Sequence, residues 1–251
     1  MASTRYPITV EGETATIGTA AELVVALDVL QGHHDHMVLE QLHPHLAEII
    51  DGPLELYSVL KVLAPDDQVY LIDALGSRLV DVVQRSGALR DILATLAESK
   101  VEERLLQTLG SEGLRSLIGS AEELSEVLEW VYGECDQLAL NLLGLGFLSR
   151  LFQSGYEFSL VLHSLDHRCQ EELVELLGWE RVLSMVHDRR DLAHLLRALP
   201  GGFSTRVLNH FGREQLWNII GDERGWRVLR DYLEADEAAY LENLLEVDDA
   251  E

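Results

Sequence analysis

Cysteine, proline and aromatic side chains are all scarce in this chain of 251 residues. The two cysteines, Cys135 and Cys169, are too few to hold together a domain of this size by disulfides, so the fold has to depend on a buried apolar core. Aromatic residues make up only 6%, while leucine is the most frequent apolar residue. This bias predicts helices, because unbranched side chains lose little rotamer freedom in them.

Basic residues are also few, since 19 Lys and Arg face 44 Asp and Glu and give a net charge of −25. Such a balance repels a polyanion and makes nucleic acid a poor partner. The charge is uneven: residues 181–230 hold nine basic and five acidic side chains, whereas 231–251 hold nine acidic and none basic. The basic stretch is interpreted either as an anion-binding surface or as a solvated face that the tail neutralises.

No long apolar run is present. The most apolar stretch, residues 138–148, is well short of the roughly 20 residues that span a bilayer. The N-terminus has no cationic segment followed by an apolar run, so no secretory signal is predicted. We therefore expect no membrane span and a cytoplasmic location, with delivery as a secreted effector left open. We also expect a monomer or a weak dimer.

Apolar–glycine pairs recur at intervals of 34 residues. The positions one, four and five residues before each glycine are apolar in every copy, which is one stripe of a short helix. Glycine adopts left-handed backbone at little cost, so we interpret these glycines as helix terminators. The pairs are Leu75-Gly76, Leu109-Gly110, Leu143-Gly144, Leu177-Gly178 and Phe211-Gly212.

A second apolar stripe, at relative positions 0, +3, +4 and +7, precedes the first in each repeat, and a shorter apolar set follows each glycine. Each repeat is therefore predicted to contain two or three short helices. The six copies of the second stripe, 33 to 35 residues apart, begin at Leu23, Leu56, Leu89, Leu124, Phe158 and Leu192.

Helices of about ten residues cannot bury an apolar stripe alone, so neighbouring repeats have to stack on a shared core. The predicted fold class is all-α, a right-handed α-solenoid of short two- or three-helix repeats. An extended arm or small hairpin around Gly12 occupies residues 1–19, a single helical-repeat domain spans 20–247, and 248–251 form an acidic tail. The predicted repeats are 20–53, 54–87, 88–120, 121–155, 156–189, 190–223 and 224–247.

Over residues 20–247 this pattern resembles tandem helical-repeat proteins in general, such as the tetratricopeptide, HEAT and armadillo classes, and it matches no single class. The resemblance implies an elongated repeat-built surface that binds a protein or peptide. Repeats of similar length also occur in a family of transcription-activator-like proteins that read DNA, but the base-reading residue pairs of that family are not recognisable here.

Histidines cluster in the first repeat, beside one aspartate. Imidazole and carboxylate groups are ligands for zinc and other transition metals, so the cluster is a candidate metal site. It supports an alternative function as a metal-binding protein or metal-dependent hydrolase. His33 to His36 are expected in the turn before a helical segment of about six residues, and His43 and His45 in the turn after it, where Pro44 is a helix breaker. The two groups would then lie at opposite ends of this segment, which weakens the alternative. The candidate ligands are His33, His34, Asp35, His36, His43 and His45.

Catalytic motifs are not recognisable in the sequence. Gly144-Leu-Gly146 has no preceding strand and is not a dinucleotide fingerprint, and G-x-S-x-G, H-E-x-x-H and phosphate-loop motifs are missing. Cys135 and Cys169 occupy equivalent positions, nine residues before a glycine, and are expected to be free thiols. We therefore predict no enzyme activity, no catalytic residues and no cofactor.

The outward positions of the first helix in each repeat vary, while the apolar stripes do not. Exposed Tyr, Trp and Arg are typical of protein-binding hot spots, although scattered surface residues of these types are common. We predict a non-enzymatic protein–protein interaction module that binds its partner here; an acidic mimic of nucleic acid is a further alternative. The predicted partner-binding residues are Tyr57, Lys61, Arg90, Trp130, His163, His194, Arg197, Arg227 and Tyr232.

Overall fold

The computed structural model describes residues 4–30, 34–96, 98–199 and 201–245. In these ranges the chain is mostly helical, as predicted, with a small antiparallel sheet near the N-terminus. Contacts group the elements into two compact units. Unit 1 combines Met1–Gly119 with Trp130–Leu143, and unit 2 combines Ser120–Glu129 with Gly144–Glu251. No described helix has both the length and the apolarity needed to cross a bilayer.

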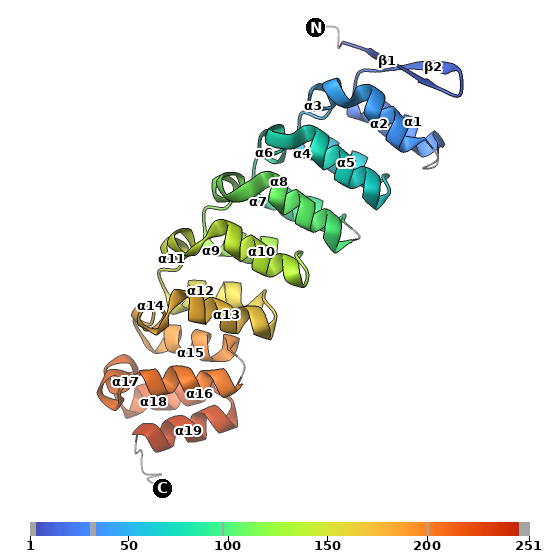
Figure 1. The fold of residues 1–251 in the computed structure, drawn as a ribbon. Coiled ribbons are helices and arrows are strands. Elements are labelled where there is room, and N and C mark those ends of the chain that lie inside the picture. Colours follow the sequence, from blue (N-terminus) through green and yellow to red (C-terminus); the bar gives the residue numbers. More distant parts are fainter. Residues whose placement is uncertain (1–3, 31–33, 97, 200, 246–251) are drawn as a thin grey trace. The chain divides into compact units, whose positions relative to one another are not determined.

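Unit 1 begins with two strands and continues with short helices (Figure 1). Short 3₁₀ turns precede two of its smallest helices. Its elements are β1 (Tyr6–Val10), β2 (Glu13–Ile17), α1 (Ala20–Leu30), α2 (Asp35–Leu42), η1 (His43–His45), α3 (Leu46–Ile49), α4 (Pro53–Leu60), α5 (Pro65–Leu75), η2 (Gly76–Arg78), α6 (Leu79–Val83), α7 (Ser86–Leu93), α8 (Ser99–Leu117) and α10 (Glu134–Leu143).

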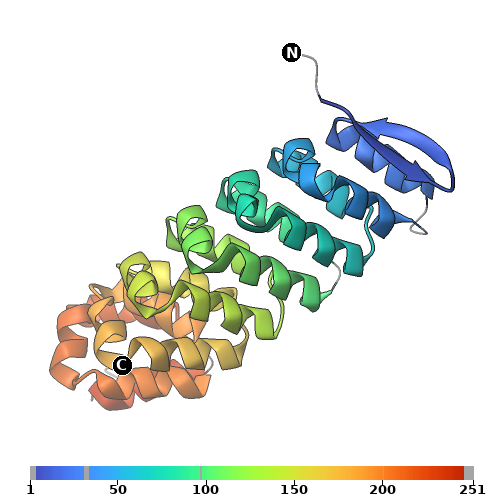
Figure 2. The same cartoon turned by 45° about the horizontal axis from the view of Figure 1, so that its top comes forward.

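A hairpin forms at the N-terminal end, which confirms that alternative for the residues around Gly12. Tyr6 lies opposite Ile17 in the antiparallel pair. Glu11 and Gly12 both have positive φ angles, as the central residues of a two-residue type I′ turn require. The strands pack on α1 and α2 (Figure 2), and Ile8 and Ile17 are buried there.

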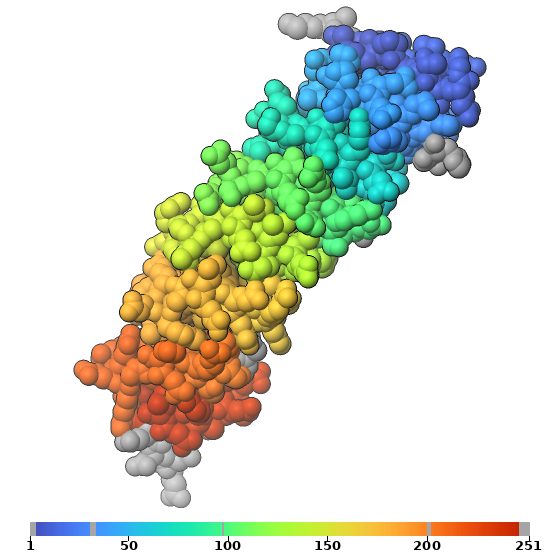
Figure 3. Space-filling view, viewed as in Figure 1, coloured from blue at the N-terminus to red at the C-terminus, as the bar shows by residue number. Residues whose placement is uncertain are grey.

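The helices of unit 1 pack in two rows. The first helices α1, α4 and α7 contact one another in sequence, and so do the second helices α2, α5, α8 and α10. Side chains fill the spaces between the second helices in the space-filling view (Figure 3). Leu56, Val59 and Leu60 of α4 are fully buried, as the predicted stripe requires.

Unit 2 consists of short α-helices in the residues that the structure describes. Its first helices α9, α12, α15 and α18 contact one another in sequence, and the stripes predicted for α9, α12 and α15 are buried. The segments that follow the recurrent glycines, whose conformation the sequence leaves open, are short α-helices here. The elements are α9 (Ala121–Leu128), α11 (Leu145–Leu151), α12 (Gly155–His163), α13 (His167–Leu177), α14 (Trp179–Ser184), α15 (Arg189–Ala198), α16 (Gly201–His210), α17 (Arg213–Ile220), α18 (Glu223–Arg230) and α19 (Ala235–Leu245).

Gly178 ends α13 and starts α14 in a backbone conformation that only glycine adopts readily. Its φ of 78° is positive, as predicted, but its ψ of 149° lies far from the left-handed helical region. Gly212 departs from the pattern, because its φ is −74°. The other recurrent glycines with positive φ are Gly76, Gly110 and Gly144.

Replacing Gly178 with alanine should lower the free energy of unfolding by about 1 to 3 kcal/mol, because a Cβ strains this backbone even though no atom lies within 4 Å of its position. Urea unfolding measures the change. Gly146→Ala is the control: Gly146 lies inside α11 with the same open space, and the change should be neutral or slightly stabilising. Equal effects of the two changes would contradict the strain at Gly178.

Buried polar side chains recur eight residues before each of the five glycines. Gln170 donates from Nε2 to the carbonyl oxygens of Leu162 and Leu165, near the end of α12. Ser204 is equally buried and donates to the carbonyl oxygen of Leu196 in α15. These bonds satisfy carbonyls that the end of a helix leaves without an intrahelical donor. The equivalent residues in unit 1 are Gln68, Glu102 and Asp136.

Gln170→Leu should lower the free energy of unfolding by about 1 to 3 kcal/mol, because it removes the side-chain donor from two buried carbonyls and leaves the Leu162 carbonyl with backbone N–H donors alone. Urea or thermal unfolding measures the loss. The matched control is Gln215→Leu, at an exposed position of α17, which should have little effect. The anchoring role of Gln170 is wrong if its replacement by the more apolar leucine leaves the unfolding midpoint unchanged.

Candidate functional site

The predicted partner-binding residues belong to both units. Tyr57 and Lys61 lie at α4, and Arg90 lies on α7. Trp130 lies in the turn after residue 128, and 39% of its surface is exposed. Those of unit 2 lie on α12, α15 and α18 or directly after α18. They are His163, His194, Arg197, Arg227 and Tyr232, all exposed.

In unit 1 the side chains of Tyr57, Lys61 and Arg90 contact residues close to them in the sequence, and Tyr57 also lines a hollow. Tyr57 lines a hollow of about 480 Å³ between α4 and α7, beside Leu54. The Lys61 Nζ lies 5.9 Å from the centre of the Tyr57 ring. Arg90 forms an ion pair of 2.8 Å with its neighbour Asp91.

In unit 2 four of the five predicted residues gather around two hollows. The first, about 450 Å³, lies between α15 and α18. Its lining includes three guanidinium groups and an imidazole but no carboxylate, so we name it the basic hollow. Its residues are Arg189, Arg190, Ala193, His194, Arg197, Val228, Leu229 and Tyr232.

A second hollow of about 790 Å³ shares Arg197 and Tyr232 with the first. His163 of α12 and Leu196 of α15 also line it. Carboxylates of the turn after α18 and of α19 line the rest, so we name it the acidic hollow. These carboxylates belong to Asp231, Glu234, Asp236 and Glu237.

Two aspartates fix the position of α15. Asp188 caps the helix, since its Oδ1 accepts hydrogen bonds from the backbone N–H groups of Arg190 and Asp191. Asp191 is buried, and its two carboxylate oxygens accept from the backbone N–H groups of Tyr156 and His187. A Cβ on Gly155 would lie 2.7 Å from the Asp191 carbonyl oxygen, so only glycine permits this approach of α12 to α15.

Six arginines of the basic stretch form two groups. Arg181 donates to the carbonyls of Ser149 and Phe152, and Arg230 pairs with Glu242 of α19. Arg206 pairs with Glu175. By contrast, Arg189, Arg190 and Arg197 take part in no ion pair within the described parts of the chain.

Sequence reasoning missed several residues of this site. Arg189 and Arg190 were divided between two predicted repeats, although α15 begins at Arg189. The cap residue Asp188, three residues before Asp191, is the sequence signal that marks this start. Tyr156, which contacts the His194 ring edge-on at 5.0 Å between centroids, carries no such signal.

The candidate metal ligands of the first repeat have separate partners. His34 lies 3.1 Å from Glu11, and His45 stacks on Tyr6 with 3.8 Å between ring centroids. His36 Nδ1 lies 3.1 Å from Asp67 Oδ1. The Tyr70 hydroxyl lies 3.2 Å from His43 Nδ1.

Asp35 is buried at the start of α2, and His33 lies outside the described residues. Among the described candidates, no three ligand atoms lie within 4.8 Å of one another. The metal site therefore stays a prediction from the sequence.

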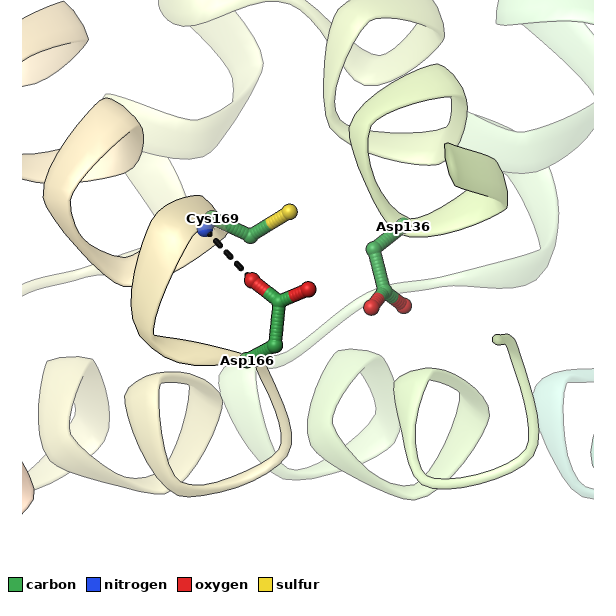
Figure 4. Close-up of side chains that lie close together, drawn as sticks. All are labelled: Asp136, Asp166 and Cys169. Atoms are coloured by element: carbon green, nitrogen blue, oxygen red, sulfur yellow. Dashed lines mark hydrogen bonds between the residues drawn. The ribbon is translucent and has the colours of Figure 1, made fainter. Parts of the chain in front are cut away.

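The two cysteines are buried and form no disulfide, as expected. In unit 2 the backbone N–H of Cys169 donates to Asp166 Oδ1 at 2.8 Å, so the Asp166 side chain caps α13 (Figure 4). In unit 1 Cys135 lies at the start of α10, and its thiol is 3.5 Å from the Ser99 carbonyl oxygen. Burial and the nearby Glu102 carboxylate raise the pKa of the Cys135 thiol to about 11. This environment disfavours the thiolate that a nucleophile requires.

At pH 8 the Cys135 thiol in a Cys169→Ala variant should react with a disulfide reagent about a hundredfold more slowly than an exposed thiol, because its pKa of about 11 leaves little thiolate. The absorbance of the released thiol follows the reaction. The rate should rise as the pH approaches 11, and unfolding in urea should abolish the protection. Reaction at the rate of a free thiol in the folded protein would contradict the raised pKa.

Comparisons with known proteins give no match: no protein-family model fits the chain, and neither the curated proteins nor the solved structures include a similar one.

Proposed function

We propose that the chain is a non-enzymatic protein–protein interaction module whose repeats stack as a right-handed α-solenoid and whose first helices carry the binding surface. One observation carries the proposal. His163, His194, Arg197 and Tyr232, predicted from outward positions of three different helices, line two adjoining hollows of unit 2.

The chemistry of these walls supports the proposal. Tyrosine and arginine contribute strongly to binding when a partner removes them from water, and Tyr232 is 55% exposed. Arg197 has no ion-pair partner among the described residues, so binding does not have to break one. Because α15 is held by Asp188 and Asp191, little ordering of the surface opposes binding.

Simultaneous replacement of His194, Arg197 and Tyr232 by alanine should reduce captured partner protein about tenfold or more, because three contacts of the binding surface are lost. Affinity capture from the organism's own extract, with quantitative mass spectrometry, measures the reduction.

The control variant removes the same three side-chain types from exposed positions outside the hollows: Tyr132→Ala, His167→Ala and Arg168→Ala. It should capture the same proteins as the unchanged chain. Melting temperatures of both variants should stay close to the original, because all six side chains are exposed. An undiminished set of captured proteins with the first variant would refute the assignment of this face.

A further inference from the structure

The basic hollow is a local reversal of charge in an acidic protein. Arg190, His194 and Arg197 lie at spacings of four and three residues on α15, so they share one face of the helix. Arg189 joins them in lining the hollow. The carboxylates nearest in sequence, Asp188 and Asp191, already accept hydrogen bonds from backbone N–H groups.

The opposite wall of the basic hollow is apolar. It consists of Val228 and Leu229 of α18 together with the Tyr232 side chain, and Val228 is 40% exposed. An occupant that matches both walls needs carboxylates toward α15 and an apolar side chain toward α18.

The acidic hollow limits the length of the anionic part of a molecule that binds in the basic hollow. Arg197 and Tyr232 form the boundary between the hollows, and beyond it lie Asp231, Glu234 and Asp236. A continuous polyanion such as nucleic acid carries charge into this region and is repelled. A polypeptide can instead change from acidic to basic within a few residues.

We infer that the basic hollow binds an acidic segment of a partner protein, in which carboxylates flank one apolar side chain and basic residues follow toward the acidic hollow. The inference rests on the proposed function and specifies the chemistry of its partner. The carboxylates pair with Arg189, Arg190 and Arg197, and the apolar side chain packs on Val228 and Tyr232.

Fluorescence anisotropy with labelled peptides tests the inference. Each peptide has about twelve residues, spanning about 40 Å when extended. One half carries Glu and Asp around a single Leu, Phe or Trp, and the other half carries Lys among Ser and Gly. Control peptides have the same composition with Glu and Lys alternating, and a single-stranded DNA of about twelve nucleotides serves as the polyanion probe.

Two variants of the full chain, each with a matched control, test the basic wall and the apolar wall of the basic hollow. Arg190→Gln with Arg197→Gln should weaken binding about tenfold or more. Its control, Arg150→Gln with Arg168→Gln, removes equal charge from exposed positions outside the hollows and should leave binding unchanged. Val228→Ser should also weaken binding, whereas Leu176→Ser, at a position of α13 that is also about two-fifths exposed, should not.

The expected result is saturable binding of the block-charged peptides that falls with added salt and depends on the hollow variants. Equal binding of the alternating peptides, no effect of Arg190→Gln with Arg197→Gln, or binding of the DNA instead of the peptides would overturn the inference. If no peptide binds while protein capture still depends on His194, Arg197 and Tyr232, the partner chemistry is wrong and the proposed function stands. If protein capture does not depend on those three residues, the proposed function is wrong as well.

Discussion

The constraint on which this structure depends is the hydrogen bonding of helix ends. Every α-helix leaves four N–H groups and four carbonyls without intrahelical partners, and short helices bring many such ends into a core. The chain satisfies them with buried polar side chains: Gln170 and Ser204 donate to carbonyls of the preceding helix, and Asp191 accepts from two backbone N–H groups. The leucine stripes supply the buried apolar surface, and these polar residues form hydrogen bonds with the backbone groups at the helix ends.

The character of the basic hollow follows from the same constraint. Backbone donors already occupy oxygens of the two aspartates of α15, so these carboxylates hold the helix in place. The arginines beside them are consequently left to the solvent or to a partner. A requirement of folding thus produces a cationic surface in a protein whose net charge is −25.

The sequence predicts well what depends on local pattern. The stripes of α4 and α12, the hairpin turn at Gly12 and the positive φ of Gly178 all follow from residue type and spacing. A polar residue also recurs eight residues before each glycine in the sequence, although its burial was not predicted. The partners of His45 and His36, which are Tyr6 and Asp67, could not be predicted because they come from other elements. The basic hollow likewise requires α15 and α18 to pack side by side.

The concentration of guanidinium groups at the start of α15 has a thermodynamic consequence. Like charges that share a small space without internal counter-ions repel one another, and this repulsion is relieved when the chain unfolds. An anion that settles among them removes the repulsion only in the folded state, so its concentration and the stability of unit 2 are linked by mass action. Binding of an anion among these arginines is therefore expected to raise the free energy of unfolding of unit 2.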